Sequence, residues 1–471
     1  MKSMMKKTAT LLMVCVLSLA PLGMMPVYAA DVSDMQADAK ELFGVEFVLN
    51  EQQALEEAGN ILDMFPTNRL GYTVFPAAFG GMYINSDGNL VVLFAENVDS
   101  EVEGGHRSDY GFRGVLFQNP QLQRYVEFSY SDLNEVFERL VETLNERNEL
   151  AISGRMSICR YQQNITFASV DVQANRVLIG LEVYSEEMIE GFRRYIFDSP
   201  MIVFEQREPS ILFYGVVYEP YPNMPPFCCN NADICFNCDI ECDCVDMVNS
   251  PCDCSEFYGI DALFSQAVNP ANMIERWETR GVTRHWFEGS VGFRVAQRPP
   301  SHMPGPSTVG FITAAHVFPH RNDNVYLNRS VIGRVDDSVF NGAMDAAFVA
   351  HNNVTNTLPN GATLGTHVVP SNNNFIQGQS IMAFGQRTQF AGGTILNNNA
   401  MLPVIHPITG NRFYLSGMVN TNMRMVGGDS GGPVFTPVMH TAGIITGGIA
   451  GTSIFFTPAH RIMRDLRAER F

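Results

Sequence analysis

Basic residues and long apolar runs are both scarce in this chain, and each scarcity argues against a class of protein. The chain has only 31 Lys and Arg residues but 49 Asp and Glu residues, which gives a formal net charge of −18. Neutralising a phosphate backbone needs the opposite balance, so we expect no nucleic-acid partner. No apolar run after residue 30 approaches the roughly 18 residues that span a bilayer, which argues against a polytopic membrane protein.

Length and composition predict a folded chain of several parts. The 471 residues are 46% hydrophobic and 17% charged, which is typical of globular proteins rather than disordered ones. A chain of this length exceeds one ordinary domain and indicates two or three.

The N-terminus has the pattern of an export signal. Three lysines within the first seven residues precede an apolar stretch from Leu11 to Met25, and small residues follow at Val27–Ala29. This predicts a signal peptide over residues 1–29, a secreted, extracellular mature chain and no membrane contact after cleavage. The alternative is an uncleaved anchor, against which two prolines and a glycine interrupt the apolar run.

Charge divides the mature chain into two halves of opposite sign. Residues 31–285 carry Lys40 and 15 Arg against 41 acidic residues, a net charge of −25. Residues 286–471 carry 12 Arg, no Lys and 8 acidic residues, a net charge of +4. We expect two parts that attract each other, although a merely acidic soluble domain would show the same asymmetry.

Three regions are predicted after the signal peptide. Residues 31–215 are expected to be α+β, with a hairpin whose strands are 79–85 and 90–94, a strand at 177–183, and helices capped by Ser131 and Ser185. Residues 216–285 form a Pro- and Cys-rich linker. From residue 286 to 471, short apolar runs between turn residues predict antiparallel strands in a barrel or a sandwich.

Eight cysteines gather within the linker. In a secreted chain an even set indicates disulfides, whereas thiolates at such spacing could instead bind zinc or another soft metal. Free thiols or crosslinks to a partner are the third alternative, and all three stay open. Cys159 has no partner in the mature count. The cluster consists of Cys228, Cys229, Cys235, Cys238, Cys242, Cys244, Cys252 and Cys254.

Three residues in the last region have the chemistry of a nucleophilic site. Ser430 lies within Gly427–Val434, where flanking glycines let a substrate approach the backbone closely. A hydroxyl needs a base to take its proton, and His316 follows the apolar stretch 309–312. Asp345, at the start of another apolar stretch, can hold the imidazole in one tautomer and stabilise its charge. Each of these residues alone is common in proteins without a catalytic role. The three motifs in this order along the chain are a far more specific sign of a nucleophilic site.

The same serine motif also fits a different enzyme class. Gly428–Gly432 satisfies the nucleophile-elbow pattern of α/β-hydrolases, which requires a helix after the serine and a catalytic histidine further on. His440 and His460 do lie downstream, but Gly432–Phe435 favours extended chain instead of a helix.

Residues 286–471 resemble the chymotrypsin-fold serine proteases, in particular the bacterial streptogrisin and α-lytic protease branch. The motifs that carry the resemblance are 290–293, 311–316, 345–348, 378–380, 393–395, 417–422, 427–434, 445–448 and 455–458. Residues 79–81 and 87–92 resemble the pro-region of the same branch. The resemblance implies an all-β protease domain of two antiparallel six-stranded β-barrels, preceded by an α+β pro-region.

The resemblance also assigns roles by position. His316, Asp345 and Ser430 would be the catalytic triad, and the N–H groups of Gly428 and Ser430 the oxyanion hole. Thr446 would support Asp345, and Gly447 and Gly448 would bind an extended peptide as an added strand. The specificity pocket would be walled by Ile445 and Ile454 together with Met425, Val426 and Ser453, which implies cleavage after apolar or aromatic residues.

The sequence departs from this branch in two ways. Residues 286–471 hold no cysteine, and both members of each usual pair are absent: Val317 with Gly289, and Met382 with Gly392. Arg424 replaces a third such cysteine, and we expect it to point outward. The basic residue usual near the aspartate before the nucleophile is replaced by Ala383, and Arg387 is the candidate substitute.

These observations predict a secreted serine endopeptidase of the chymotrypsin type, made as a zymogen and needing no cofactor. Its partners would be polypeptide substrates and its own pro-region, which would act as an intramolecular inhibitor and folding chaperone. The alternative is a catalytically silent, protease-like binding scaffold organised around the cysteine cluster.

Overall fold

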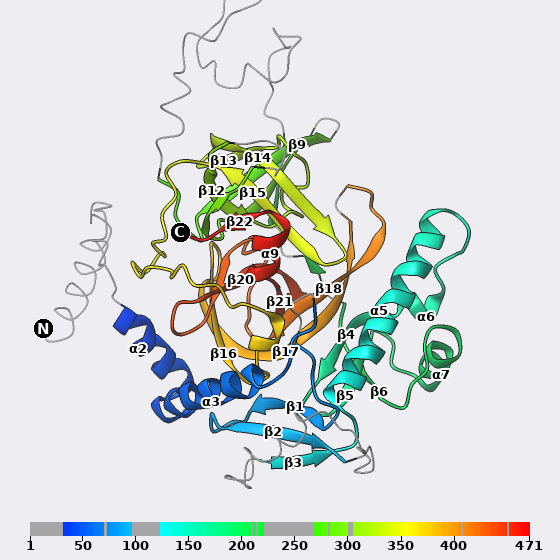
Figure 1. Ribbon diagram of the computed structural model, residues 1–471. Helices are drawn as coiled ribbons and strands as arrows, with labels where there is room; N and C mark the ends of the chain where they lie inside the picture. Colours follow the sequence, from blue (N-terminus) through cyan, green and yellow to red (C-terminus); the bar gives the residue numbers. More distant parts are fainter. Residues whose placement is uncertain are drawn as a thin grey trace, which may run out of the picture.

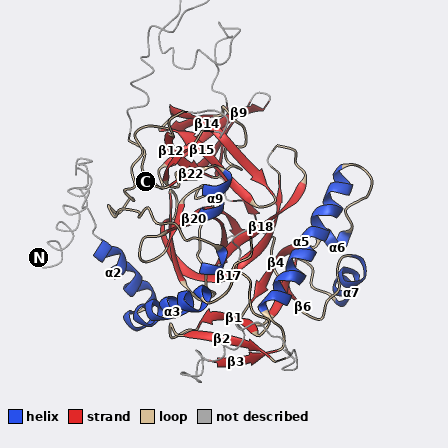
Figure 2. Ribbon diagram, in the orientation of Figure 1, coloured by secondary structure: helices blue, strands red, loops and turns tan. Residues whose placement is uncertain are grey.

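The computed structural model describes residues 32–69, 73–96, 123–209, 211–212, 215–220, 267–280, 283–299, 305–406, 408–449 and 452–471. The predicted signal peptide and all eight clustered cysteines lie outside these residues. Strands dominate the centre of the molecule, and most helices lie at its periphery (Figure 2). Within the described residues, no helix has the length and apolar character needed to cross a membrane.

Six strands in the C-terminal part close into a ring. They pair in the order β16-β19-β20-β21-β18-β17, and an additional β16–β17 pairing closes the ring. The ring has the number of strands that the sequence predicts for one barrel. Its strands are β16 (Ser380–Gly385), β17 (Gln389–Ile405), β18 (Arg412–Thr421), β19 (Pro433–Phe435), β20 (Thr441–Ile449) and β21 (Ser453–Pro458), followed by helix α9 (Ala459–Asp465).

The preceding half is a nine-stranded sheet, larger than the six strands expected. Its order is β22-β11-β12-β15-β14-β13-β9-β10-β8. Its strands are β8 (Gly215–Pro220), β9 (Met273–Arg280), β10 (Thr283–Ser290), β11 (Arg294–Gln297), β12 (Thr308–Thr313), β13 (Asn324–Leu327), β14 (Ser330–Asn341), β15 (Met344–Ala350) and β22 (Ala468–Glu469).

The expected boundary at residue 286 falls inside strand β10. Strands β8 and β9 come from the region expected to be a linker, yet both pair with β10 along most of its length. The density of proline and cysteine in that region obscured two short strands at its ends. Residue 286 therefore lies within a strand and not between two elements.

The N-terminal region has the expected α+β character. The hairpin is confirmed as β1 with β2, and its turn contains Gly88 at φ 84°. The long helix α5 is capped by Ser129, whose Oγ accepts a hydrogen bond from the N–H of Asp132 at 3.1 Å, so the expected cap Ser131 is wrong. The cap Ser185 is confirmed. The elements are α2 (Val32–Phe43), α3 (Val45–Asp63), β1 (Phe79–Ile84), β2 (Leu90–Ala95), β3 (Gln123–Val126), α5 (Tyr130–Ile152), α6 (Arg160–Gln163), β4 (Ile165–Asp171), β5 (Arg176–Leu181), α7 (Glu186–Tyr195), β6 (Ile202–Gln206) and β7 (Ile211–Leu212).

These N-terminal elements surround the closed ring. Helices α2 and α3 lie on one side of it, β1–β3 beneath it, and α5–α7 with β4–β6 on the other side (Figure 1). Strand β4 pairs with β17 through Ala400 opposite Ser169 and Met401 opposite Ala168, so β4-β5-β6 continues the sheet of the ring. Backbone hydrogen bonds thus join the two regions.

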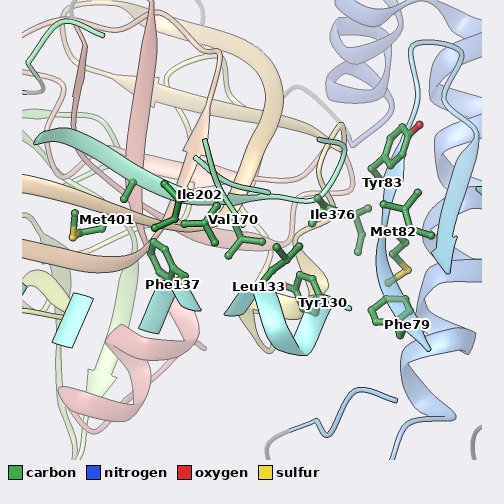
Figure 3. Close-up of a cluster of buried hydrophobic side chains, with 14 of the residues drawn as sticks. Phe79, Met82, Tyr83, Tyr130, Leu133, Phe137, Val170, Ile202, Ile376 and Met401 are labelled. Carbon is green, nitrogen blue, oxygen red and sulfur yellow. The ribbon is translucent and has the colours of Figure 1, made fainter. Parts of the chain in front are cut away.

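A single hydrophobic core spans the junction. Leu133 and Phe137 of α5 pack in one cluster with Ile376 and Met401, which belong to the ring and its approach (Figure 3). Tyr414 of β18 is fully buried in the same cluster. Burying such side chains contributes about 1.5–3 kcal/mol each, so the N-terminal region and the ring stabilise one another.

A second contact joins α3 to the start of β16. The buried Glu51 carboxylate accepts hydrogen bonds from the N–H and the hydroxyl of Ser380. Nearby, the N–H of Ile84 donates to the carbonyl of Gln377 at 2.7 Å, and Gly378 leaves no space there for a side chain. Burial raises the pKa of Glu51 above its ordinary value, against the effect of the two Ser380 hydrogen bonds.

In two of the missing cysteine pairs, the two residues that replace the cysteines lie next to each other. A Cβ on Gly289 would lie 3.2 Å from both methyl groups of Val317. Met382 and Gly392 stand directly opposite each other in the β16–β17 pairing. The fold thus keeps the geometry in which such cross-links form, while Val317 and Met382 supply apolar contacts instead.

We predict that Glu51 makes the precursor less stable as pH rises. A carboxyl with a raised pKa in the folded state binds its proton more tightly there than when unfolded. The free energy of unfolding therefore falls as pH rises from the ordinary glutamate pKa, about 4.3, to the raised pKa. Above the raised pKa it no longer changes with the titration of Glu51. Urea unfolding of a Ser430→Ala precursor against pH measures this. Glu51→Gln should flatten that part of the curve, and Glu56→Gln, at an exposed position of α3, should not. Parallel curves for all three proteins would refute the prediction.

We also predict that Gly289→Cys/Val317→Cys forms a disulfide. The adjacency of the two positions makes the bond geometrically accessible, and it should raise the free energy of unfolding by about 2–4 kcal/mol. Peptide mapping under non-reducing conditions identifies the bond, and unfolding with and without reductant measures its effect. Single-cysteine variants are the controls for the native thiols. A double variant that stays uncrosslinked after oxidation contradicts the prediction.

Candidate active site

His316 and Asp345 form a fully buried pair that is joined by two hydrogen bonds. The Nδ1 of His316 lies 2.7 Å from Oδ2 of Asp345, and its backbone N–H donates to Oδ1 at 2.9 Å. Both side chains are 0% exposed. Because an ionised carboxylate only accepts hydrogen bonds, the neutral imidazole carries its proton on Nδ1. Its Nε2 then has the lone pair of a general base.

The local sequence explains why both residues are fixed. Asp345 is the second residue of β15, whose neighbours Met344 and Ala346 are fully buried. His316 follows β12, which pairs with β15 through Thr313 opposite Ala347. The two side chains therefore come from adjacent strands of the nine-stranded sheet.

Ser430 comes from the other sheet and is held against the first. Its backbone carbonyl accepts from the N–H of Ser290 at 2.7 Å, and its Oγ donates to the carbonyl of Thr446 at 3.2 Å. The next residue, Gly431, has φ 87° and lies against Thr313 and Ala314, with no space for a Cβ. The serine turn thus packs directly on the strand end that leads to His316.

The turn before Ser430 has the backbone needed for an oxyanion hole. Gly428 adopts φ 100°, a conformation that favours glycine. The N–H of Asp429 donates to Val426 and that of Gly431 to Ile445. Among the described residues, the N–H groups of Gly428 and Ser430 take part in no such backbone bond.

Thr446 reaches Asp345 only through a residue that the sequence analysis did not assign. The hydroxyls of Thr446 and Thr457 are 2.8 Å apart, and Thr457 Oγ lies 3.5 Å from the backbone carbonyl oxygen of Asp345. Thr457 belongs to the motif at 455–458. The sequence of this motif does not indicate which neighbouring residues the Thr457 hydroxyl contacts.

Strand β20 contains Gly447 and Gly448, the two glycines expected to bind peptides. It pairs with a strand from the chain's own N-terminal region. Gly447 opposes Leu212 and Gly448 opposes Ile211, in an antiparallel arrangement of β7 on β20. Strand β7 thus occupies the edge of β20 beside Ser430.

The residues expected to wall the specificity pocket are mostly buried in one apolar cluster. Met425, Ile445 and Ile454 belong to it, while Val426 is 49% exposed. Arg424 is exposed, in agreement with the expected outward direction.

The expected basic partner of Asp429 is absent from the described residues. The Arg387 guanidinium pairs with Glu288, with Nε 3.0 Å from Oε2. Only the backbone N–H of Arg387 reaches Asp429, at 2.8 Å. The candidate substitute therefore contributes its main chain and not its charge.

Several solved structures are similar to this chain. Protease A of Thermobifida fusca has 25% identity, covering 44% of this chain and 98% of its own, with a TM-score of 0.34. A Nocardiopsis protease has 22% identity, covering 44% and 99%, with a TM-score of 0.33. A Cellulomonas bogoriensis chymotrypsin has 22% identity, covering 44% and 99%, with a TM-score of 0.32.

Matches to family models are found at two places, although no curated protein matches the chain. The model described as Trypsin matches residues 282–464, which begin at β10, and the model described as Pro-like C-terminal domain matches residues 131–207. The chain therefore contains a trypsin-family serine protease domain at 282–464, preceded by a Pro-like C-terminal domain at 131–207.

Proposed function

We propose that the chain is a secreted serine endopeptidase made as a self-inhibited precursor. The observation that carries the proposal is the buried His316–Asp345 pair, joined by two hydrogen bonds, together with a serine turn that packs on the strand end leading to His316. A binding scaffold has no need of a buried imidazole–carboxylate pair, whose desolvation is costly.

In this mechanism Ser430 attacks the scissile carbonyl carbon, and Nε2 of His316 takes the hydroxyl proton. The proton then passes to the leaving amine, and a water repeats the sequence to release the acyl group. Asp345 holds the imidazole tautomer through Nδ1 and stabilises the imidazolium. The hydroxyl of Ser430, which donates to Thr446 in the precursor, must turn toward His316 before attack.

The developing oxyanion would be bound by the N–H groups of Gly428 and Ser430. Each such donor typically contributes about 3–4 kcal/mol to transition-state stabilisation. The N–H of Asp429 is bonded to Val426 within the turn and that of Gly431 to Ile445 of β20, whereas the N–H groups of Gly428 and Ser430 take part in no such bond among the described residues.

The pro-region would inhibit by occupying the substrate strand. A peptide that adds to β20 gains main-chain hydrogen bonds from Gly447 and Gly448, and Ile211 and Leu212 oppose those glycines. We infer that maturation cuts the chain after β7, so that this strand can leave the edge of β20.

The triad is tested by covalent labelling and by two variants. The wild-type protein should react with a fluorophosphonate probe at Ser430 and hydrolyse peptides. Ser430→Ala should be secreted uncut, unlabelled and inactive, and Asp345→Asn should lower turnover by about 10⁴-fold because the wrong tautomer is favoured. If the wild-type protein neither labels nor hydrolyses any peptide, the scaffold alternative holds instead.

The maturation site is tested by N-terminal sequencing of the secreted product. We expect a product that begins after Leu212 and so lacks β7. An active secreted product that still contains β7 would show that this strand does not inhibit.

A further inference from the structure

Asp429, the residue before the nucleophile, carries a fully buried carboxylate. Its exposed fraction is 0%, and among the described residues no ion pair involves it. An unpaired buried carboxylate is costly unless its oxygens accept several hydrogen bonds. The donors that surround Asp429 therefore decide whether its turn keeps its shape.

Four neutral donors surround this carboxylate, two at each oxygen. Oδ1 accepts from the backbone N–H groups of Arg387 and Thr388, at 2.8 and 3.0 Å. Oδ2 accepts from the N–H of Val426 at 3.0 Å and from the hydroxyl of Thr388. The hydroxyl is the one side-chain donor of this set, and Thr388 supplies two of the four bonds.

The turn that carries Thr388 is shaped around the carboxylate. Gly385 lies against the carboxyl group of Asp429, with no space for a Cβ between them. Strand β16 ends at Gly385 and β17 begins at Gln389, so three of the four donors sit in the short connection of a hairpin whose two strands are paired.

The same carboxylate closes the turn that presents the oxyanion donors. The N–H of Asp429 donates to the carbonyl of Val426, and the carboxylate accepts from the N–H of Val426. These two bonds hold residues 426–429 in one conformation. Gly428 lies inside this turn, so the direction of its N–H depends on the Asp429 carboxylate.

We infer that Thr388 is the positioning residue of the oxyanion turn, in place of a basic side chain. The inference rests on the proposed function. Thr388 does not touch the substrate. Its hydroxyl and its N–H hold Asp429, and Asp429 holds the turn. Without the hydroxyl, Oδ2 keeps a single donor and the buried carboxylate loses one of its four hydrogen bonds.

The test compares Thr388→Val with Thr388→Ser in the full chain after maturation. Valine keeps the shape but lacks the donor, whereas serine keeps the donor. We expect Thr388→Val to lower kcat by about 10–100-fold with KM changed by less than about threefold. This is below the ~10²–10³-fold cost of deleting an oxyanion donor outright. Thr388→Ser should restore kcat to within about threefold, and Thr308→Val, on an exposed strand position, controls for the substitution type.

A transition-state analogue separates positioning from stability. Affinity for a peptide boronic acid, which fills the oxyanion hole, should fall in Thr388→Val by the same factor as kcat/KM. Rates are taken per folded molecule by active-site titration, and Thr388→Ala replaces the valine variant if that variant does not fold.

The outcomes distinguish this inference from the proposed function. An inactive wild-type protein refutes the function. An active wild-type protein with an equally active Thr388→Val variant refutes the inference alone. A loss of kcat confined to Arg387→Gln would also refute it, since a cation would then hold the turn. A loss that serine does not restore would show that packing, and not the hydroxyl, is responsible.

Discussion

The candidate active site depends on a set of hydrogen bonds centred on Ser290, the last residue of β10. Its N–H donates to the carbonyl of Ser430, its hydroxyl donates to the carbonyl of Gly428 at 2.9 Å, and its own carbonyl accepts from the Thr313 hydroxyl at 2.9 Å. The histidine and aspartate belong to one sheet and the serine to the other. These bonds therefore hold the serine turn against the sheet that leads to the other two residues.

Ser290 also joins the two turns around the nucleophile. Its Oγ accepts from the N–H of Gln386 at 3.0 Å while it donates to Gly428. One buried hydroxyl thus connects the hairpin turn of β16 and β17 to the oxyanion turn. A hydroxyl can do this because it is a donor and an acceptor at once.

The sequence allowed candidate site residues to be predicted more readily than their surroundings. The proposed triad, the serine turn and the two glycines of β20 could be named as candidates because each needs particular residue types at particular places. Thr457 and Thr388 could not, because a threonine on a strand or in a turn is common and only the pairing of distant strands gives it a role. Strands β8 and β9 were missed since they are short and flank a segment of unusual composition. The cap of α5 was misplaced by two residues because Ser129 and Ser131 are both plausible in the local sequence.

The continuity of β4 with β17 has a consequence for the proposed maturation. While the N-terminal region is in place, Ala400 and Met401 have a neighbouring strand, and Tyr414 and Ile376 lie in a shared core. Release of that region would turn this part of β17 into a sheet edge with apolar side chains beside it, the kind of surface on which strands of other molecules add. A matured protein would therefore associate with itself more readily as its concentration rises.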